Sequence, residues 1–373
     1  MKKVKLAIFT AGRSDFGIMQ NLLKKIEKSK KIDQTIIVGP AHQLQIFGNT
    51  KKEILNNNFK KVFFLKNNFL KKKNVNTSIL ISKIINNTSE LLEKNQFNAA
   101  IILGDRYEMF SFSIACMNFN LPIIHLGGGS VTLGSHDDIY RNAISLMSKM
   151  HLVETKKHKE NLINNGIRKN IYVIGAPALE NLGVLKKDKK IDIFKNLDKN
   201  KNLIVSCFHP ETNKSYAYNR KNLKILINFL NYTKQNIIFT YPNADEGYLK
   251  YIKEIHKKLN KKNTKIIKSL GILKYHKLLS QSSLLIGNSS SGIIESCSFK
   301  IPFINLGNRQ KGRYAPKNVV NCNFRYNEII KKYKKVNSQN FKRKLLKLNN
   351  PYHVINSSEK AYKYIYNFIR NIK

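Results

Sequence analysis

Three consecutive serines stand in the stretch LLIGNSSSGIIES, at positions 284–296, between one apolar run and a second that ends at Glu295. Hydroxyl side chains at the start of a helix cap exposed backbone N–H groups. The same N–H groups, with the helix dipole behind them, also form a binding site for an anion such as phosphate. For this stretch taken alone, a helix cap and a phosphate site are both open.

Glycine-rich polar segments follow apolar runs at six further places. They are TAGRSDFG (10–17), LGDRYEMF (103–110), HLGGGSVTLGSHDDIYRN (125–142), CFHPETN (207–213), YPNADEG (241–247) and GNRQKGR (307–313). Turns favour these residue types, so one such segment would mean little. Seven segments, each directly after an expected strand, predict a polar site built at strand ends.

The elements that must position these segments alternate between strand and helix. We expect strands at 4–10, 34–39, 61–66, 99–104, 121–130, 150–155 and 171–176, and a second series at 203–208, 236–241, 264–269, 283–287 and 302–307. Amphipathic helices are expected at 16–29, 77–94, 109–118 and about 357–370, and the last could pack on either domain. Short apolar strands separated by helices indicate parallel sheets covered on both faces.

The fold class expected is therefore α/β, with two Rossmann-like domains whose parallel sheets face a central cleft. A charged stretch at 185–202 separates the two series of strands, which gives domains of 1–180 and 181–373. At 373 residues the chain exceeds the size of one ordinary core. A ligand is expected at the carboxyl ends of the strands, between the two domains.

Composition narrows the class of protein. The hydrophobic share is 42%, and no apolar run approaches the ~18 residues that span a bilayer. The apolar part of MKKVKLAIFTAGRSDFG (1–17) is too short for a signal peptide. The four cysteines lie far apart without a C-x-x-C pair, which argues against zinc and disulfides and favours a cytoplasmic protein.

The net charge is unusual, because 67 Lys and Arg face only 23 Asp and Glu, a formal charge of +44. Such an excess of positive charge is typical of proteins that bind nucleic acid. The lysines, however, are scattered among Asn and Ile, as an AT-rich genome produces, and no nucleic-acid motif stands out. Nucleic acid and membrane are therefore not expected as partners, whereas an anionic small molecule is.

Common nucleotide fingerprints are missing. The first turn lacks G-x-G-x-x-G, and GNSSSG is not followed by Lys and Ser or Thr, so neither a dinucleotide site nor a Walker loop is expected. No cluster has zinc-ligand spacing, and no metal is expected.

Four motifs strongly resemble the hydrolysing UDP-N-acetylglucosamine 2-epimerases, in the branch that feeds sialic and legionaminic acid synthesis. They are GDRYEM (104–109), HPET (209–212), LGILKYHKLLSQSSLLIGNSSSGIIE (270–295) and NLGNRQKGR (305–313). The likeness covers essentially the whole chain. It implies the glycosyltransferase-B architecture, a UDP-sugar as small-molecule substrate and a homodimer.

The resemblance assigns roles to particular residues. Ser289 and Ser290 would hold the diphosphate and Glu295 the ribose. The remaining substrate-binding matches are Arg13, Arg141 and Arg309, and the catalytic matches are Asp105, Asp137, Asp138 and His209. Arginines suit phosphate because their contacts are charge-assisted. For Asp137 and Asp138, a plain helix cap stays open.

The family reaction removes a proton from sugar C2 while UDP leaves from C1, and water then adds to the glycal with reprotonation of C2 from the opposite face. The products are N-acetylmannosamine and UDP. The reaction implies a base, an acid and a phosphate clamp, and no redox cofactor.

This chain departs from the family pattern at two positions that usually carry acid or base groups and at the position after Arg141. Gly127 and Ser130 stand where an acidic or histidine side chain and a glutamate are usual, and Asn142 replaces a frequent histidine. Either Asp105, Asp138 and His125 suffice, or the sugar differs, or epimerisation is lost. A nucleotide-sugar hydrolase or glycosyltransferase is the first alternative, and a non-catalytic binder of nucleotide sugar or nucleic acid the second.

Overall fold

The computed structural model describes residues 3–43, 50–66, 76–186, 197–242 and 247–372. The side chains of residues 13, 14, 181 and 183–186 are outside this description. The chain divides into two compact units. Unit 1 comprises Met1–Ser130, Asp137–Glu180 and Val354–Lys373, and unit 2 comprises Val131–His136 and Asn181–His353.

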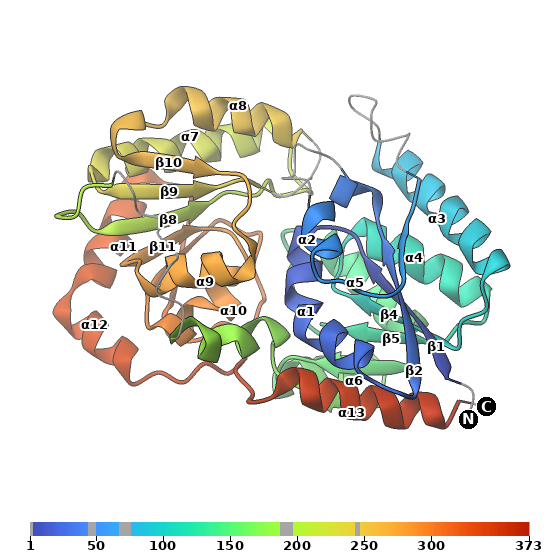
Figure 1. Cartoon of the computed structure of the whole chain (residues 1–373). Helices are drawn as coiled ribbons and strands as arrows, with labels where there is room; N and C mark the ends of the chain where they lie inside the picture. Colours follow the sequence, from blue (N-terminus) through green and yellow to red (C-terminus); the bar gives the residue numbers. More distant parts are fainter. Residues whose placement is uncertain (1–2, 44–49, 67–75, 187–196, 243–246, 373) are drawn as a thin grey trace. The chain divides into compact units, whose positions relative to one another are not determined.

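Unit 1 contains a sheet of seven described strands, all parallel, in the order β3-β2-β1-β4-β5-β6-β7 (Figure 1). The strands are β1 (Val4–Thr10), β2 (Ile32–Val38), β3 (Val62–Phe64), β4 (Ala99–Leu103), β5 (Ile123–Leu126), β6 (Met150–Val153) and β7 (Ile171–Val173). The helices are α1 (Arg13–Glu27), α2 (Lys51–Leu55), α3 (Thr77–Lys94), α4 (Tyr107–Asn118), α5 (Asp137–Met147), α6 (Lys156–Asn164) and α13 (Ser357–Arg370).

Both faces of this sheet are buried, as its uninterrupted apolar strands require. Leu6 and Ile8 of β1 pack with α1 and α13 in one core, and Ala7 and Phe9 pack with α3 and α4 in another. The helix expected at 357–370 is α13, and it lies against α1 in unit 1 (Figure 1).

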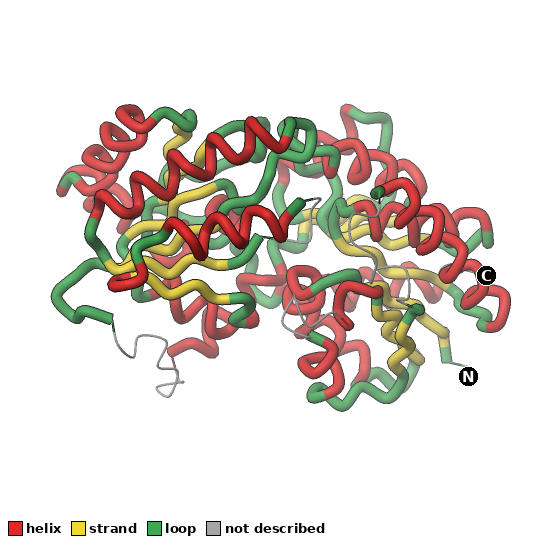
Figure 2. Tube along the Cα trace, turned by 90° about the horizontal axis from the view of Figure 1, so that it is seen from above, coloured by secondary structure: helices red, strands yellow, loops and turns green. Residues whose placement is uncertain are grey.

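Unit 2 contains six described parallel strands in the order β10-β9-β8-β11-β12-β13. The strands are β8 (Leu203–Cys207), β9 (Asn236–Thr240), β10 (Thr264–Ile267), β11 (Leu284–Gly287), β12 (Phe303–Leu306) and β13 (Val319–Cys322). The helices are α7 (Tyr216–Thr233), α8 (Tyr248–Lys258), α9 (Gly271–Ser280), α10 (Ser291–Ile294), α11 (Tyr326–Asn337) and α12 (Gln339–Leu346). Helices flank the strands of each sheet (Figure 2).

The expectation of an α/β fold with two parallel sheets is confirmed, with two corrections. The strand expected over 121–130 ends at Leu126, because Gly127 has a φ of +84° and leaves the extended conformation. The sequence analysis also missed β13. Its four residues include Asn321, whose side chain is exposed, and this makes the apolar signal weak.

Candidate active site

The order of strands in unit 1 reverses between β1 and β4, and ligands of such sheets bind at that reversal. Arg13 begins α1, which follows β1, and the loop after β4 contains Asp105. Gly104, with a φ of +88°, turns the chain out of β4 directly before Asp105. Asp105 therefore lies at the carboxyl end of β4, with about a quarter of its side chain exposed.

Arg141 joins Asp105 to the first turn of α5. Its side chain is 1% exposed, and one terminal nitrogen, Nη2, donates to Oδ2 of Asp105. The other, Nη1, donates to Oδ1 of Asp138 at 3.1 Å and to the carbonyl oxygen of Ser130 at 2.8 Å. The planar guanidinium thus holds two carboxylates at once, a geometry that a lysine cannot reproduce.

The neighbouring carboxylates keep the buried Arg141 positively charged. Burial alone would lower its pKa, but Asp105, Asp137 and Asp138 outweigh that effect and raise the pKa above the usual value. The guanidinium therefore stays positive. Asp137 and Asp138 both lie in the first turn of α5 and not before it, so a plain helix cap is the wrong interpretation of this pair.

His125 is not available for proton transfer. It is fully buried, with Nδ1 3.0 Å from Oγ of Ser145 and Nε2 2.8 Å from the carbonyl oxygen of Gly104. Because that carbonyl can only accept, Nε2 carries the proton. Burial lowers the pKa of His125 to about 3, so the ring stays neutral. His125 fixes the backbone before Asp105, and the expectation that it could supply an acid or base is wrong.

Unit 2 has its own reversal, between β8 and β11, and His209 and the serines follow these two strands. Asn288 connects them: its Nδ2 donates to the carbonyl oxygen of His209, and its Oδ1 accepts from the N–H of His209, both at 2.8 Å. Nε2 of His209 lies 3.2 Å from Sγ of Cys207. Asn288 is fully buried, so it fixes the loop that carries His209.

The serine turn, formed by Ser289, Ser290 and Ser291, does not cap α10 through a side chain. Ser290 precedes α10, but its hydroxyl makes no capping hydrogen bond. Oγ of Ser291 contacts Oγ of Ser289 at 3.2 Å and the hydroxyl of Tyr275 at 2.6 Å. Helix α10 has only four residues, so its dipole is small. An anion at this turn would rely on hydroxyls and individual N–H groups.

The loop after β12 contacts the residue before the serines. Nη1 of Arg309 and Nε2 of Gln310 donate to the carbonyl oxygen of Asn288, at 3.4 Å and 3.1 Å. The segment 131–136 packs on this loop within unit 2. The N–H of Leu133 donates to the carbonyl oxygen of Lys311 at 3.0 Å, and any side chain at Gly134 would collide with the backbone of Asn308.

Glu295 meets a histidine that the sequence analysis did not select. Its Oε2 lies 2.7 Å from Nε2 of His276, a fully buried side chain of α9. The contact uses one carboxylate oxygen and leaves Oε1 for another donor. His276 therefore orients Glu295, and a histidine inside an amphipathic helix gave no signal of this role.

The structure brings the described site residues together in two groups, one in each unit. Unit 1 holds Asp105, Asp137, Asp138 and Arg141, and unit 2 holds His209, Ser289, Ser290, Glu295 and Arg309. The backbone of Arg13 begins α1, but its side chain lies outside the described residues, as do residues 243–246 of YPNADEG. Within the described residues, no three His, Cys, Asp or Glu side chains converge as metal ligands.

The two departures from the family pattern lie beside the unit 1 group. Gly127 faces Gly104, since a side chain at position 127 would come within 3.9 Å of the Gly104 backbone. Ser130 is 4% exposed, and its hydroxyl has no hydrogen-bond partner among the described residues. The positions expected to carry acid or base groups are thus next to Asp105 and Arg141.

The fold and the site define a protein of two Rossmann-like units. A carboxylate–arginine cluster lies at the carboxyl ends of the strands in unit 1, and a serine turn lies at the carboxyl ends of the strands in unit 2. Residues 24–366 match the family model described as UDP-N-acetylglucosamine 2-epimerase, and the chain belongs to this family. It is 36% identical to a Campylobacter jejuni protein named GDP/UDP-N,N'-diacetylbacillosamine 2-epimerase (hydrolyzing), over 92% of this chain and 90% of that protein. It is 30% identical to the Escherichia coli polysialic acid biosynthesis protein P7, over 98% and 95% of the two chains.

Solved structures agree on the fold. A protein from Listeria monocytogenes titled a UDP-N-acetylglucosamine 2-epimerase superposes with a TM-score of 0.81 at 17% identity, covering 100% of this chain and 98% of that one. The UDP-GlcNAc 2-epimerase from Neisseria meningitidis, solved with UDP-GlcNAc bound, gives a TM-score of 0.79 at 19% identity, covering 99% and 100%. No described helix is both long and apolar enough to cross a membrane.

Proposed function

We propose that the protein is a hydrolysing nucleotide-sugar 2-epimerase. The substrate is UDP-N-acetylglucosamine or a related UDP- or GDP-linked 2-acetamido sugar, and the products are the free manno-configured sugar and the nucleoside diphosphate. The observation that carries the proposal is the cluster of Asp105, Asp138 and buried Arg141 at the strand reversal of unit 1. Relatives named as hydrolysing 2-epimerases support the same reaction.

Each chemical step has a candidate group. The proton on sugar C2 passes to Asp105, while the bond from C1 to the diphosphate breaks and the nucleoside diphosphate leaves with the electron pair. Water then adds its oxygen to C1 of the glycal, the proton that the water loses passes through Asp138 or Asp137 to C2 on the opposite face, and Asp105 releases its proton to solvent. General acid–base groups contribute about 10² to 10⁴-fold each.

Residues of unit 2 bind the nucleotide part in this proposal. Ser289 and Ser290 hold the diphosphate, Arg309 neutralises its charge, and His209 donates to the departing phosphate oxygen. Stabilisation of charge on a leaving group supplies much of the rate enhancement in such reactions. Glu295 uses the oxygen not engaged by His276 to accept from a ribose hydroxyl. Arg13 contributes a further positive charge.

The second candidate is a nucleotide-sugar hydrolase or glycosyltransferase that leaves C2 unchanged. Gly127 and Ser130 favour it, because they remove two expected acid or base groups next to Asp105. Heavy water separates the two reactions. An epimerase introduces deuterium at C2 of its product, whereas a hydrolase does not, and a transferase requires an acceptor.

The decisive experiment is phosphorus NMR of the purified protein in heavy water with UDP-N-acetylglucosamine, GDP-N-acetylglucosamine and a UDP-diacetamido-trideoxy sugar in turn. Proton NMR of the freed sugar follows. Release of diphosphate with a deuterated manno-configured sugar identifies the reaction and the substrate. Release without deuterium selects the hydrolase, and no release from any of the three overturns the assignment.

Three further expectations belong to the proposal. The product is N-acetylmannosamine or its diacetamido counterpart, which enters sialic or legionaminic acid synthesis. The four cysteines are buried and free, in line with a cytoplasmic location. A homodimer would cover Ile139 and Leu146 of α5, which are both 68% exposed. Sedimentation velocity measures the oligomeric state, and a monomer at micromolar concentration would contradict the dimer.

A further inference from the structure

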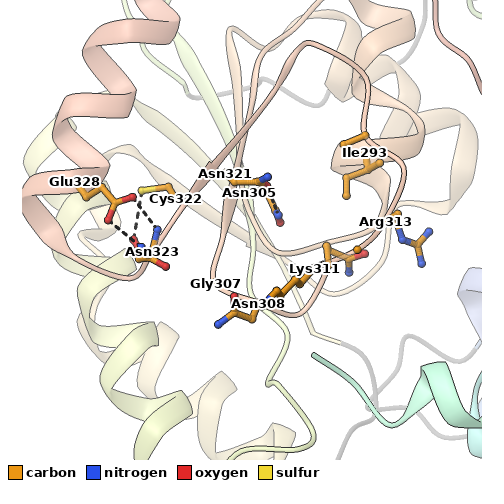
Figure 3. Close-up of a pocket in the computed structure, with 13 residues that line it drawn as sticks. Ile293, Asn305, Gly307, Asn308, Lys311, Arg313, Asn321, Cys322, Asn323 and Glu328 are labelled. Atoms are coloured by element: carbon orange, nitrogen blue, oxygen red, sulfur yellow. Dashed lines mark hydrogen bonds between the residues drawn. The ribbon is translucent and has the colours of Figure 1, made fainter. Parts of the chain in front are cut away.

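Unit 2 contains a pocket of about 250 Å³ whose lining includes none of the catalytic or substrate-binding residues predicted from the sequence (Figure 3). It lies at the carboxyl ends of β12 and β13. These neighbouring strands are parallel, and such pairs are usually joined by a helix that covers the sheet. Here residues 307–318 make the crossover as a loop without a helix. The missing helix leaves the pocket open under the loop.

Polar side chains dominate the lining. Asn305 and Asn321 come from the strands, and Gln310, Lys311 and Arg313 come from the loop (Figure 3). Nδ2 of Asn305 donates to Oδ1 of Asn321 at 2.9 Å. Such a lining suits a hydroxylated ligand and not an apolar one.

Two buried oxygens on this lining lack donors. Gln310 is 3% exposed, and its amide nitrogen donates to the carbonyl oxygen of Asn288, which fixes the opposite orientation for Oε1. Asn305 is also 3% exposed. Within the described chain, neither Oε1 of Gln310 nor Oδ1 of Asn305 accepts a hydrogen bond. These oxygens lie beneath the pocket surface, so Gln310 and Asn305 form part of its fixed wall.

The positively and negatively charged side chains of the lining lie at opposite ends of the pocket. Lys311 and Arg313 lie on the loop side, whereas Glu328 lies at the other end of the pocket (Figure 3). The carboxylate of Glu328 accepts from N and Nδ2 of Asn323 at 3.2 Å and 3.3 Å, and these contacts lower its pKa. The cationic end suits an anionic group, and the remaining lone pairs of Glu328 suit hydroxyls.

We infer that this pocket binds a small hydroxylated anion, either a sugar acid or a sugar phosphate, at a site separate from the nucleotide site. The volume lies below the ~300 to 1,000 Å³ of drug-sized sites, so it fits one sugar ring and not a nucleotide. The anionic group pairs with Lys311 and Arg313, and the hydroxyls reach Asn321 and Glu328.

The test is isothermal titration of the full chain, saturated with UDP, with gluconate, glucose 6-phosphate and neutral glucose. We expect one or both anions to bind and glucose to bind at least tenfold more weakly. Binding by gluconate alone identifies a sugar-acid site, and binding by glucose 6-phosphate alone identifies a sugar-phosphate site. No binding of either anion, or equal binding of glucose, overturns the inference.

Variants locate the binding. Lys311 is exposed and tolerates substitution, so Lys311→Ala should weaken the anion about tenfold, Lys311→Glu should weaken it further, and Lys311→Arg should preserve it. Lys317→Ala is the matched control, because Lys317 belongs to the same loop but does not line the pocket. Anion binding that Lys311→Glu leaves unchanged, or that appears only when UDP is removed, overturns the assignment to this pocket.

Discussion

At the scale of single residues, the chemistry depends on a carboxylate that is held firmly and still meets solvent. Asp105 follows a glycine of positive φ, its preceding carbonyl is bound by His125, and its side chain is bound by Arg141. These contacts reduce the freedom of Asp105 before any substrate arrives. Such preorganisation is what a positioned base requires.

Asp105→Asn tests the assigned base. Asparagine keeps the size of the side chain and an oxygen for Arg141, but it cannot accept a proton. Turnover of the nucleotide sugar should fall at least about 100-fold, as measured by release of nucleoside diphosphate at saturating substrate. Asp198→Asn, at an exposed position of unit 2, is the control and should retain full turnover. Near-normal turnover of the Asp105 variant would remove Asp105 from the mechanism.

Arg141→Gln tests the same cluster through the free energy of unfolding. The substitution leaves Asp105 and Asp138 facing each other without their shared counter-charge. Breaking a buried ion pair from one side costs about 3 to 5 kcal/mol, and we expect the low end, since solvent reaches both carboxylates. Urea unfolding measures the loss. The exposed pair of Lys157 and Glu160 gives the comparison, because Lys157→Gln should cost less than about 1 kcal/mol. Equal effects would mean that Arg141 is not the anchor of the cluster.

The polar segments that contain Asp105 and His209 could be predicted from the sequence because they follow apolar strands directly. Arg141 lies within α5 and was selected by its resemblance to the family motif, and the roles of all three residues stay predictions. The supporting residues could not be predicted. Asn288 and His276 act through contacts with residues 79 and 19 positions away in the chain, and nothing local marks such partners. The neutral state of His125 likewise depends on burial by the whole unit.

At the scale of elements, the helix α13 depends on a cap from a distant residue. Asn356 occupies its cap position with a φ of 56° and gives no side-chain hydrogen bond. Glu180 takes this role, since its carboxylate accepts from N and Oγ of Ser358 and from Nδ2 of Asn21 at 3.5 Å. A negative charge at the first turn also interacts favourably with the helix dipole.

Glu180→Gln should therefore loosen the start of α13. The loss of a charged cap costs about 1 to 2 kcal/mol, and hydrogen exchange of the amides in 357–370 should rise relative to the rest of unit 1. Glu160→Gln is the control, because Glu160 forms a solvent-exposed ion pair with Lys157 in α6 and does not belong to the first turn of α13. Unchanged exchange in 357–370 would show that apolar packing alone holds α13.

Sequence periodicity located these elements better than it located their ends. The helix expected at 77–94 is α3 without a shift, because Asn76 caps it through its side chain at Ser78. Most strands end one to three residues earlier than expected, because the expected ranges included the first residues of the following turn, such as Gly39, Gly104 and Gly307. The attachment of α13 to unit 1 was left open by the sequence. It depends on Ala361, Ile365 and Ile369 meeting the core of β1 and α1.

At the scale of the whole molecule, unit 1 contains three buried histidines whose pKa values are lowered. His42, His125 and His151 all belong to unit 1 and are at most 1% exposed. Burial lowers the pKa of His42 and His125 to about 3 and that of His151 to about 4. In the unfolded chain these groups titrate near 6.5, so only the unfolded state gains protons between these values.

Unit 1 should consequently lose stability as the pH falls below about 6.5, and the loss should level off only near pH 3 to 4. Each histidine contributes at most about 1.4 kcal/mol per pH unit. Asp15 and Glu53, whose pKa values burial raises, act in the opposite direction as the pH falls, and the window to measure is pH 6.5 to 5, where the three histidines outnumber these two carboxyls. Native-state hydrogen exchange at these pH values should show unit 1 amides losing protection relative to unit 2 amides, and His151→Leu should reduce the slope by about one third. Equal loss in both units would contradict the argument, because it would place the acid sensitivity outside these three histidines.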